Sequence, residues 1–299
     1  MKKWREKQMK ISGLSKTIHG KHILSDINFS IETGSIIGVT GRNGAGKTTL
    51  LRTMTGILDP TKGDVTIDGY SIFKKPQTKE QVIFVPDSSE AFKNYSTKEI
   101  LTLYKNIYSK FDEEYFYGLM DRFSLPFVKK TGAYSKGMKA LFSLIIAFST
   151  GAKYILLDEP TDGLDVIVKK QVLQILVEEV AAKDVSIIIS SHRLDELEFM
   201  ANKIIMIKDG KVDSLYEIEE MKEMYKKVQL VFKEAMPQNL KKEVTILDQT
   251  GRVYTVIMDR NDPKLQHMIE ETDPLLFEEL PLLLEDIFVA KLGGVSNVS

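Results

Sequence analysis

The residue types best suited to chemistry gather in one glycine-rich stretch, Gly41-Arg42-Asn43-Gly44-Ala45-Gly46-Lys47-Thr48. It matches G-x-x-x-x-G-K-[ST], in which glycines let the chain turn tightly and bring backbone N–H groups close to phosphate oxygens. We expect the Lys47 ammonium to bridge the outer phosphates of a nucleotide and the Thr48 hydroxyl to bind Mg²⁺. The residues predicted to hold the phosphates are Gly41, Asn43, Gly44, Ala45, Gly46, Lys47, Thr48 and Thr49.

The segments on both sides of this stretch distinguish a phosphate loop from an ordinary glycine-rich turn. Residues 35–40 form a short apolar run that predicts a buried strand, and residues 48–54 predict the start of a helix. A helix N-terminus carries partial positive charge and favours bound anions. The strand, loop and helix together favour the phosphate site.

A second candidate for chemistry is the apolar segment 154–157, which ends in the two carboxylates Asp158 and Glu159. Asp158 is placed to hold the Mg²⁺ shell, as in other phosphate-loop enzymes, and Glu159 stands where a base for water would sit. A strand ending in Asp-Glu is a weak signal alone. It becomes informative because a phosphate loop precedes it.

His192 follows the next predicted strand, after Ser190 and Ser191. The carboxyl ends of parallel strands face the ligand crevice of an α/β sheet, so we expect this imidazole to bind a γ-phosphate or to orient water. The alternative is a surface histidine with no role in chemistry, and the position at a strand end favours the functional interpretation.

A third cluster, Tyr134-Ser135-Lys136-Gly137-Met138, opens a long apolar helix. A hydroxyl, a cation and a glycine at a helix N-terminus make an anion site, although Ser135 is equally suited to be a simple helix cap.

The predicted elements alternate between strand and helix up to about residue 213, which is typical of an α/β protein with a largely parallel sheet. A helical insertion interrupts this alternation at 96–130, where Ser96 and Glu99 form a capping box. Two or three strands are expected within 10–31, further strands at 35–40, 64–68, 81–86, 153–158, 185–190 and 203–207, and further helices at 48–56, 135–150 and 167–182.

The pattern changes after Asp213, and we place a domain boundary there, between 9–213 and 214–299. The second segment carries no catalytic motif and predicts a small α+β domain. Its expected helices are 217–227, 265–271 and 275–292, and its expected strands are 228–232, 244–247 and 253–258.

The composition narrows the functional classes. The chain has 299 residues, a formal net charge of −1 and no cysteine, so disulfide frameworks, zinc ribbons and thiol catalysis are excluded and no overall charge favours nucleic acid. The longest apolar runs fall short of the roughly 20 residues that span a bilayer, and the basic N-terminal segment lacks the apolar stretch of a signal peptide. We therefore expect any membrane role to depend on a partner subunit.

The order of these motifs over about residues 9–212 resembles that of the ATP-binding subunits of ABC transporters. The motifs shared with that family are the loop 41–48, the signature 134–138, the carboxylate strand 156–159, the turn 162–165 and His192. The resemblance implies a phosphate-loop NTPase core with a mostly parallel sheet, an antiparallel β subdomain and a helical subdomain at about 92–150. The signature and the tail segment 283–288 look like ABC-2 type exporters, especially Gram-positive exporters of antimicrobial peptides and phenol-soluble modulins.

The resemblance also implies cofactors and partners. ATP and Mg²⁺ would lie between two nucleotide-binding subunits, in a homo- or heterodimer arranged head to tail, with Ser135, Lys136, Gly137 and Asp165 completing the partner's site. Integral membrane permease subunits would couple to the helical insertion, which places the chain in the cytoplasm at the inner face of the membrane. No nucleic acid is expected.

Three positions depart from the family pattern. Asp87 replaces a glutamine that touches Mg²⁺ and senses the permease, and we expect its shorter, charged side chain to reach Mg²⁺ through water. Ile18 replaces an aromatic that stacks on adenine, with His19 beside it, so we expect weak discrimination between bases. Lys136 adds a charge to the signature, where it either holds the opposite γ-phosphate or is solvated, and Tyr134 replaces a leucine there.

Two other functions compete with a transporter subunit. A soluble ABC-type ATPase acting on nucleic acid or ribosomes would carry zinc modules, long coiled-coil insertions or two ATP cassettes, and the sequence has none of these. A regulatory module without turnover conflicts with the presence of Lys47, Asp158, Glu159 and His192.

Overall fold

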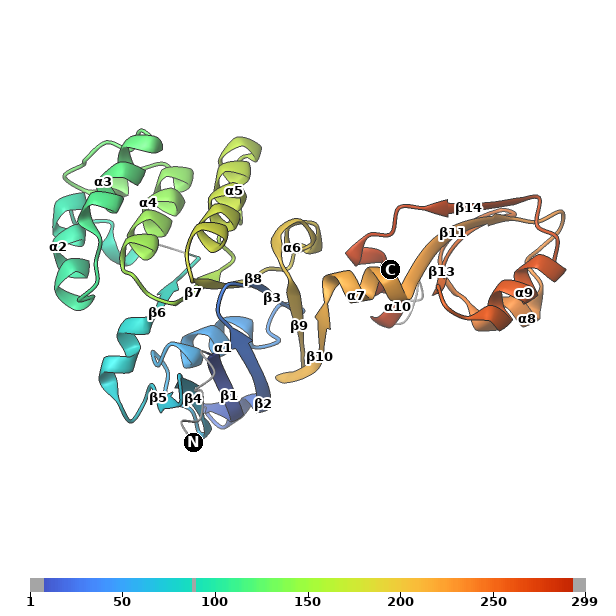
Figure 1. Ribbon diagram of the computed structural model, residues 1–299, viewed down its shortest axis with the longest axis horizontal. Coiled ribbons are helices and arrows are strands. Elements are labelled where there is room, and N and C mark those ends of the chain that lie inside the picture. The colour runs from blue at the N-terminus through green and yellow to red at the C-terminus, as the bar shows by residue number, and fades with distance from the viewer. Residues whose placement is uncertain (1–7, 88–89, 293–299) are drawn as a thin grey trace, which may run out of the picture. The chain divides into compact units, whose positions relative to one another are not determined.

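The computed structural model in Figure 1 describes residues 8–87 and 90–292, so most of the basic N-terminal segment lies outside it. The chain forms two compact units. Unit 1 runs to Arg193 and also holds Met200–Leu215, whereas unit 2 holds Leu194–Phe199 and the chain from Tyr216 onward. The second division falls two residues beyond the boundary placed at Asp213, and a short segment before it also clusters with unit 2.

A six-stranded sheet forms the centre of unit 1, in the order β10-β9-β3-β8-β7-β6. The pairings from β9 through β6 are all parallel. Three of these strands, β3, β7 and β8, are buried at every position, as expected for parallel strands covered on both faces. The bounds are β3 Ile36–Thr40, β6 Val82–Val85, β7 Tyr154–Asp158, β8 Ser186–Ser190, β9 Lys203–Lys208 and β10 Lys211–Glu217.

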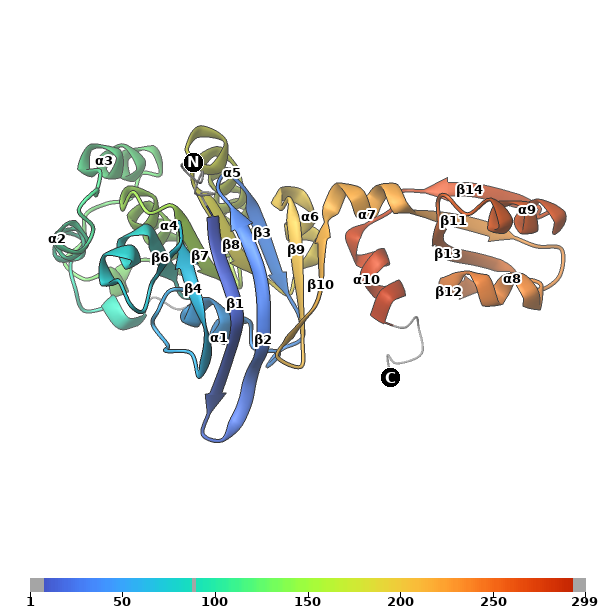
Figure 2. The same cartoon turned by 60° about the horizontal axis from the view of Figure 1, so that its bottom comes forward.

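A second, antiparallel sheet has the order β2-β1-β4-β5 (Figure 2). Its strands are β1 Gln8–Ile18, β2 Lys21–Glu32, β4 Lys62–Ile67 and β5 Tyr70–Ser71. The inner side chains of this sheet join one apolar core with the parallel sheet and with helix α1, Lys47–Met54. The core therefore holds the helix that starts at the phosphate loop between two sheets.

The four helices α2 to α5 of unit 1 each begin at a side chain that accepts backbone N–H groups. Ser96 and Glu99 form the expected capping box of α2, and Asp112, Ser135 and Asp165 cap the next three helices. Helices α2 and α3 lie together with α4 in the helical region, and α4 and α5 pack against the parallel sheet (Figure 1). The bounds are α2 Thr97–Ile107, α3 Glu113–Arg122, α4 Lys136–Ser149 and α5 Val166–Ala182.

Unit 2 is built on a four-stranded antiparallel sheet in the order β12-β13-β11-β14. Val228 and Leu230 of β11 point into an apolar core shared with α8 and α9, and Lys227, just before Val228, forms a hydrogen bond with Asp286 of α10 at 2.9 Å. Because neighbouring side chains of a strand point to opposite faces, α10 lies on the other face from α8 and α9. The bounds are α6 Leu194–Met200, α7 Ile218–Met224, β11 Tyr225–Val231, α8 Gln238–Glu243, β12 Thr245–Thr250, β13 Val253–Asp259, α9 Pro263–Glu271, β14 Leu276–Leu280 and α10 Leu284–Leu292.

The α/β fold class predicted from the sequence is confirmed, and several element boundaries are wrong. The helix predicted over 275–292 is strand β14 followed by α10, because residues 276–280 pair with the edge of β11 and Pro281 blocks a continuous helix. The helix predicted over 217–227 ends at Met224, since Tyr225 already pairs with Asp259. Helices α6 and α8 were not predicted. Within residues 8–87 and 90–292, no helix is both long and apolar enough to cross a bilayer.

Candidate nucleotide site

The glycine-rich stretch forms the turn between β3 and α1, as predicted. Gly46 takes the position before α1 with φ +107°, a left-handed conformation that favours glycine. Gly41 passes so close to β9 that a Cβ there would lie 2.3 Å from the carbonyl oxygen of Ile207. Both positions therefore require glycine, and the loop backbone is held against the end of the sheet.

Lys47 is buried at the first residue of α1. Its Nζ donates to the carbonyl oxygen of Gly41 at 2.9 Å and lies 3.8 Å from Oε1 of Glu159. An ammonium group between a phosphate loop and a carboxylate can exchange these partners for phosphate oxygens. The predicted phosphate lysine and the predicted base are thus neighbours.

Asp158 lies at the buried carboxyl end of β7 and joins two hydroxyl groups. Its Oδ1 accepts from Thr48 Oγ1 at 3.1 Å and from Ser190 Oγ at 2.6 Å. A hydroxyl oxygen and a carboxylate are ligands that suit Mg²⁺, which also keeps waters and phosphate oxygens in its shell. The residues present fit the ion, and Thr48 and Asp158 are the ones that would hold it. In the described part of the chain, no cluster of three or more His, Cys, Asp or Glu forms a metal site made wholly by protein.

Glu159 follows β7 in a left-handed backbone conformation, with φ +48°, which is uncommon for a non-glycine residue. Its N–H donates to the carbonyl oxygen of Ser190 and to Ser190 Oγ, both at 3.1 Å. Its Oε2 lies 3.0 Å from Nδ1 of the half-exposed His192. The structure therefore brings Lys47, Glu159 and His192 into one chain of contacts, with the Glu159 carboxylate in the middle.

Ser190 was missed as a site residue by the sequence reasoning. It is fully buried and touches both carboxylate positions, Asp158 through its hydroxyl and Glu159 through its hydroxyl and its carbonyl oxygen. The available signal was a hydroxyl at the end of a buried strand that neighbours the carboxylate strand.

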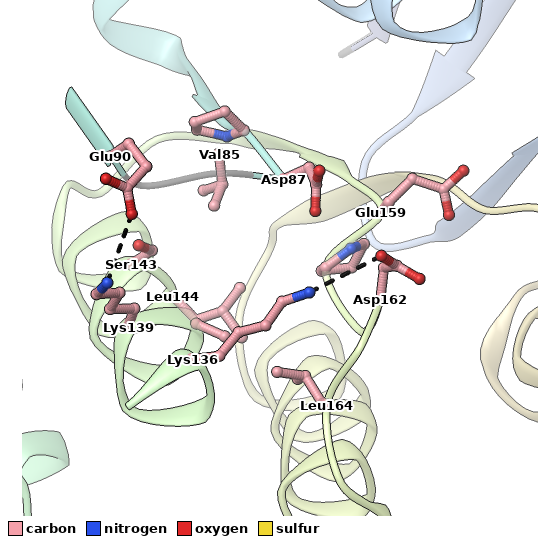
Figure 3. A pocket seen from close by; sticks show the side chains of 13 residues that line it. Val85, Asp87, Glu90, Lys136, Lys139, Ser143, Leu144, Glu159, Asp162 and Leu164 are labelled. Atoms are coloured by element: carbon pink, nitrogen blue, oxygen red, sulfur yellow. Dashed lines mark ion pairs between the residues drawn. The ribbon is translucent and has the colours of Figure 1, made fainter. Parts of the chain in front are cut away.

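Asp87 follows β6 and lines a cavity of about 360 Å³ together with Glu159, Lys136 and Asp162 (Figure 3). Burial raises the pKa of the Asp87 carboxyl above its usual value, and the positive charge of Lys136 opposes that rise. The negative charges of Asp162 and Asp158 raise the pKa of Asp87 further.

The signature residues lie at the start of α4. Ser135 Oγ accepts the N–H of Met138 at 3.2 Å, and Gly137 is so close to α5 that a Cβ there would lie 3.0 Å from Val168 Cγ1. Among the described contacts, these two residues meet α4 and α5 and not the phosphate loop of their own chain. Lys136 forms an ion pair with Asp162 at 3.8 Å, an arrangement that neither of the two predicted roles included.

Asp165 is occupied as the cap of α5, because its carboxylate accepts the N–H groups of Ile167 and Val168 at 3.0 Å each. Its predicted contact with nucleotide stays a prediction.

Ile18 and His19 lie at the turn between β1 and β2. Ile18 is partly buried and His19 is exposed, and His19 and Gly20 both have positive φ, as in a two-residue hairpin turn. The following part of β2 lies against the phosphate loop, since a Cβ on Gly46 would be 3.1 Å from the carbonyl oxygen of Ile23. The hairpin is thus anchored at the loop, and the base contact of Ile18 or His19 stays a prediction.

The fold and this site define a phosphate-loop nucleotide hydrolase. Residues 24–162 match the family model described as ABC transporter. The chain is 39% identical over 282 residues to the ABC transporter ATP-binding protein YtrB of Bacillus subtilis (strain 168), covering 94% of this chain and 97% of that protein. The chain therefore belongs to the ABC transporter ATP-binding proteins, which are ATPases, and the resemblance seen in the sequence is confirmed.

Two further comparisons agree with this family. The bacitracin transport ATP-binding protein BcrA of Bacillus licheniformis is 26% identical over 304 residues, covering 96% of this chain and 97% of that protein. A solved ATP-binding subunit of an ABC transporter has a TM-score of 0.65 at 24% identity, covering 72% of this chain and 91% of that one, and this likeness concerns the fold alone.

Proposed function

We propose that this chain hydrolyses ATP to drive export of peptides, toxins or antimicrobials through membrane permease subunits. The observation that carries the proposal is the meeting of Lys47, Asp158, Glu159 and His192 at the carboxyl ends of β3, β7 and β8. A relative that transports bacitracin and aligns with nearly the whole chain, unit 2 included, supports the exporter assignment.

The proposed reaction depends on positioning and charge. The Lys47 ammonium and the loop N–H groups hold the phosphates. Thr48 and Asp158 would hold Mg²⁺, which would supply positive charge to neutralise the phosphates. Glu159 accepts the proton of the attacking water, and His192, bonded to Glu159, orients that carboxylate and meets the γ-phosphate.

A second nucleotide-binding subunit completes the proposed site. No contact within the described residues joins Ser135 or Gly137 to the phosphate loop of their own chain, and they lie at a helix N-terminus that favours anions. The proposal places them, with Asp165, against the nucleotide of the partner subunit. Two copies, or one copy and a related chain, would close around ATP and separate after hydrolysis.

The proposed permease contact lies at the helical region. Three exposed apolar side chains lie on α2 or just before it, namely Tyr95, Leu103 and Ile107. Exposed apolar side chains of this kind suit contact with a membrane subunit, which would hold this chain at the cytoplasmic face of the membrane.

The first test is steady-state phosphate release from ATP by the purified chain, with Lys47→Ala as the control. Turnover that disappears in Lys47→Ala supports the proposal. Tight ATP binding without turnover, in the chain alone and with its membrane partners, would favour the regulatory module instead.

The second test is affinity purification of the tagged chain from detergent-extracted membranes. The proposal expects a polytopic membrane protein in stoichiometric amount. Recovery of ribosomes or nucleic acid in place of a membrane protein would favour the soluble ATPase.

A further inference from the structure

Three segments distant in the sequence meet around the cavity beside Glu159. Asp87 comes from the segment after β6, Lys136 from the first turn of α4, and Asp162 from the turn after β7. Figure 3 shows the Lys136 ammonium reaching across the cavity to Asp162, on the side where Asp87 and Glu159 also lie. Two of these residues, Asp87 and Lys136, are departures from the family pattern.

The Lys136 ammonium is held at the turn by two features. Its Nζ lies 3.8 Å from Oδ2 of Asp162, and a Cβ placed on Gly163 would lie 2.4 Å from that Nζ. Gly163 has φ +61°, so the turn uses glycine both for its backbone conformation and for the space that the ammonium fills.

Lys136 pairs with the turn after β7, and Glu159 belongs to that same turn. The N–H of Asp162 donates to the carbonyl oxygen of Glu159 at 3.1 Å. This hydrogen bond couples the position of Asp162 to the backbone conformation of Glu159. That backbone is in the uncommon left-handed region and needs support from its surroundings.

Asp87 supplies the other negative charge at Lys136. Both side chains line the same cavity, in which Asp87 and Asp162 supply negative charge near the Lys136 ammonium (Figure 3). Without that cation, the charges of Asp87, Asp158 and Asp162 would repel one another across the cavity.

We infer that Lys136 is a positioning residue that joins Asp87 and Asp162 within one subunit and so holds the start of α4 against the turn of Glu159. Asp87 and Lys136, which both depart from the family pattern, then carry charges that complement each other. This inference rests on the proposed function, since it makes Lys136 support the hydrolytic carboxylate of its own chain.

Lys139 provides a matched control. It lies one turn further along α4, lines the same cavity and pairs with Glu90 at 3.6 Å, and no described contact joins it to the 159–162 turn. Lys139→Gln therefore removes a similar charge from the same helix.

The first test measures amide hydrogen exchange of residues 159–165 in the protein without nucleotide. Lys136→Gln should accelerate this exchange about two- to fivefold, as expected for a half-exposed ion pair, while Lys139→Gln and Lys136→Arg should leave it unchanged. Equal exchange in Lys136→Gln and the unaltered chain would overturn the inference.

The second test is a double-mutant cycle on ATP turnover with Lys136→Gln and Asp162→Asn. Each change should lower kcat about two- to fivefold with KM nearly constant, and the double variant should resemble the single ones. Effects that multiply would overturn the pairing. Absence of turnover in the unaltered chain would contradict the proposed function, and the exchange measurement would still decide the role of Lys136.

Discussion

Glu159 combines an uncommon backbone conformation with contacts to three residues that the sequence separates widely. Its side chain meets Lys47 and His192, and its N–H meets Ser190. A left-handed non-glycine residue costs about 1–3 kcal/mol unless its surroundings enforce it, and the two bonds from the Glu159 N–H to Ser190 help to hold this backbone in place.

Replacing Ser190 by alanine should lower ATP turnover about tenfold, because both Asp158 and Glu159 lose a hydrogen bond that orients them. The free energy of unfolding should fall by about 1–3 kcal/mol. Ser186→Ala is the control, since its buried hydroxyl donates to Glu32 at the other end of β8. The free energy of unfolding should fall in Ser186→Ala while its turnover stays unchanged. Full turnover in Ser190→Ala would show that Ser190 does not orient the two carboxylates.

Replacing Gly46 by alanine should weaken ATP binding at least about tenfold, because a side chain would strain the left-handed backbone and crowd Ile23 and Leu24 of β2. Equilibrium binding of a fluorescent ATP analogue measures this. Gly69→Ala is the control variant. Gly69 also has a positive φ, +79°, but nothing lies within 4 Å of the added Cβ. This variant therefore carries similar backbone strain without crowding, and it should bind the ATP analogue normally.

The sequence was sufficient to predict which residues the fold brings together where local pattern decides their position. Asp158 ends β7, His192 follows β8 closely, and Lys47 begins the helix after the loop at the end of β3. Parallel strands bring such ends together at one edge of a sheet. The role of Ser190 escaped prediction because it depends on a hydrogen bond between neighbouring strands, which local pattern does not encode.

At the scale of elements, polar contacts tie α3 of the helical region to α5 of the core. The hydroxyl of Tyr115 donates to the buried carboxylate of Glu179, which Lys183 also pairs with at 3.1 Å, and Arg122 pairs with Glu178 at 2.8 Å. The helical region is therefore fixed at its α3 side as well as through α4.

Tyr115→Phe should lower the free energy of unfolding by about 1–2 kcal/mol, because the buried carboxylate of Glu179 loses its hydroxyl donor. Chemical denaturation measures the change. Tyr117→Phe, on the same helix, removes a long and exposed hydrogen bond to Glu113 at 3.4 Å. It should leave the free energy of unfolding nearly unchanged. Equal losses in the two variants would contradict the assignment.

Strand β14 is an element that the sequence pattern did not predict. Residues 275–280 are apolar and acidic without a decisive period, and the strand forms because β11 offers an edge for residues 276–280. Local preference alone does not reveal such a partner, whereas the capping box at Ser96 and Glu99 is local and was predicted correctly.

At the scale of the whole molecule, unit 1 holds the nucleotide site and unit 2 has its own apolar core. We propose that unit 2 serves dimer contact or regulation, since every residue predicted to do chemistry lies outside it. Deleting residues 216–299 should leave ATP affinity within about threefold and should reduce ATP-dependent association, measured by light scattering. Unchanged association and turnover after the deletion would contradict this role.

The measurement that tests the central claim most directly is ATP turnover by Glu159→Gln beside the unaltered chain, with ATP binding measured on the same samples. Glutamine keeps the shape and cannot take a proton from water, so binding should persist and phosphate release should fall about 100-fold or more. Phosphate release within threefold of the unaltered chain would contradict the account, because hydrolysis would then not depend on the carboxylate that Lys47, Ser190 and His192 surround.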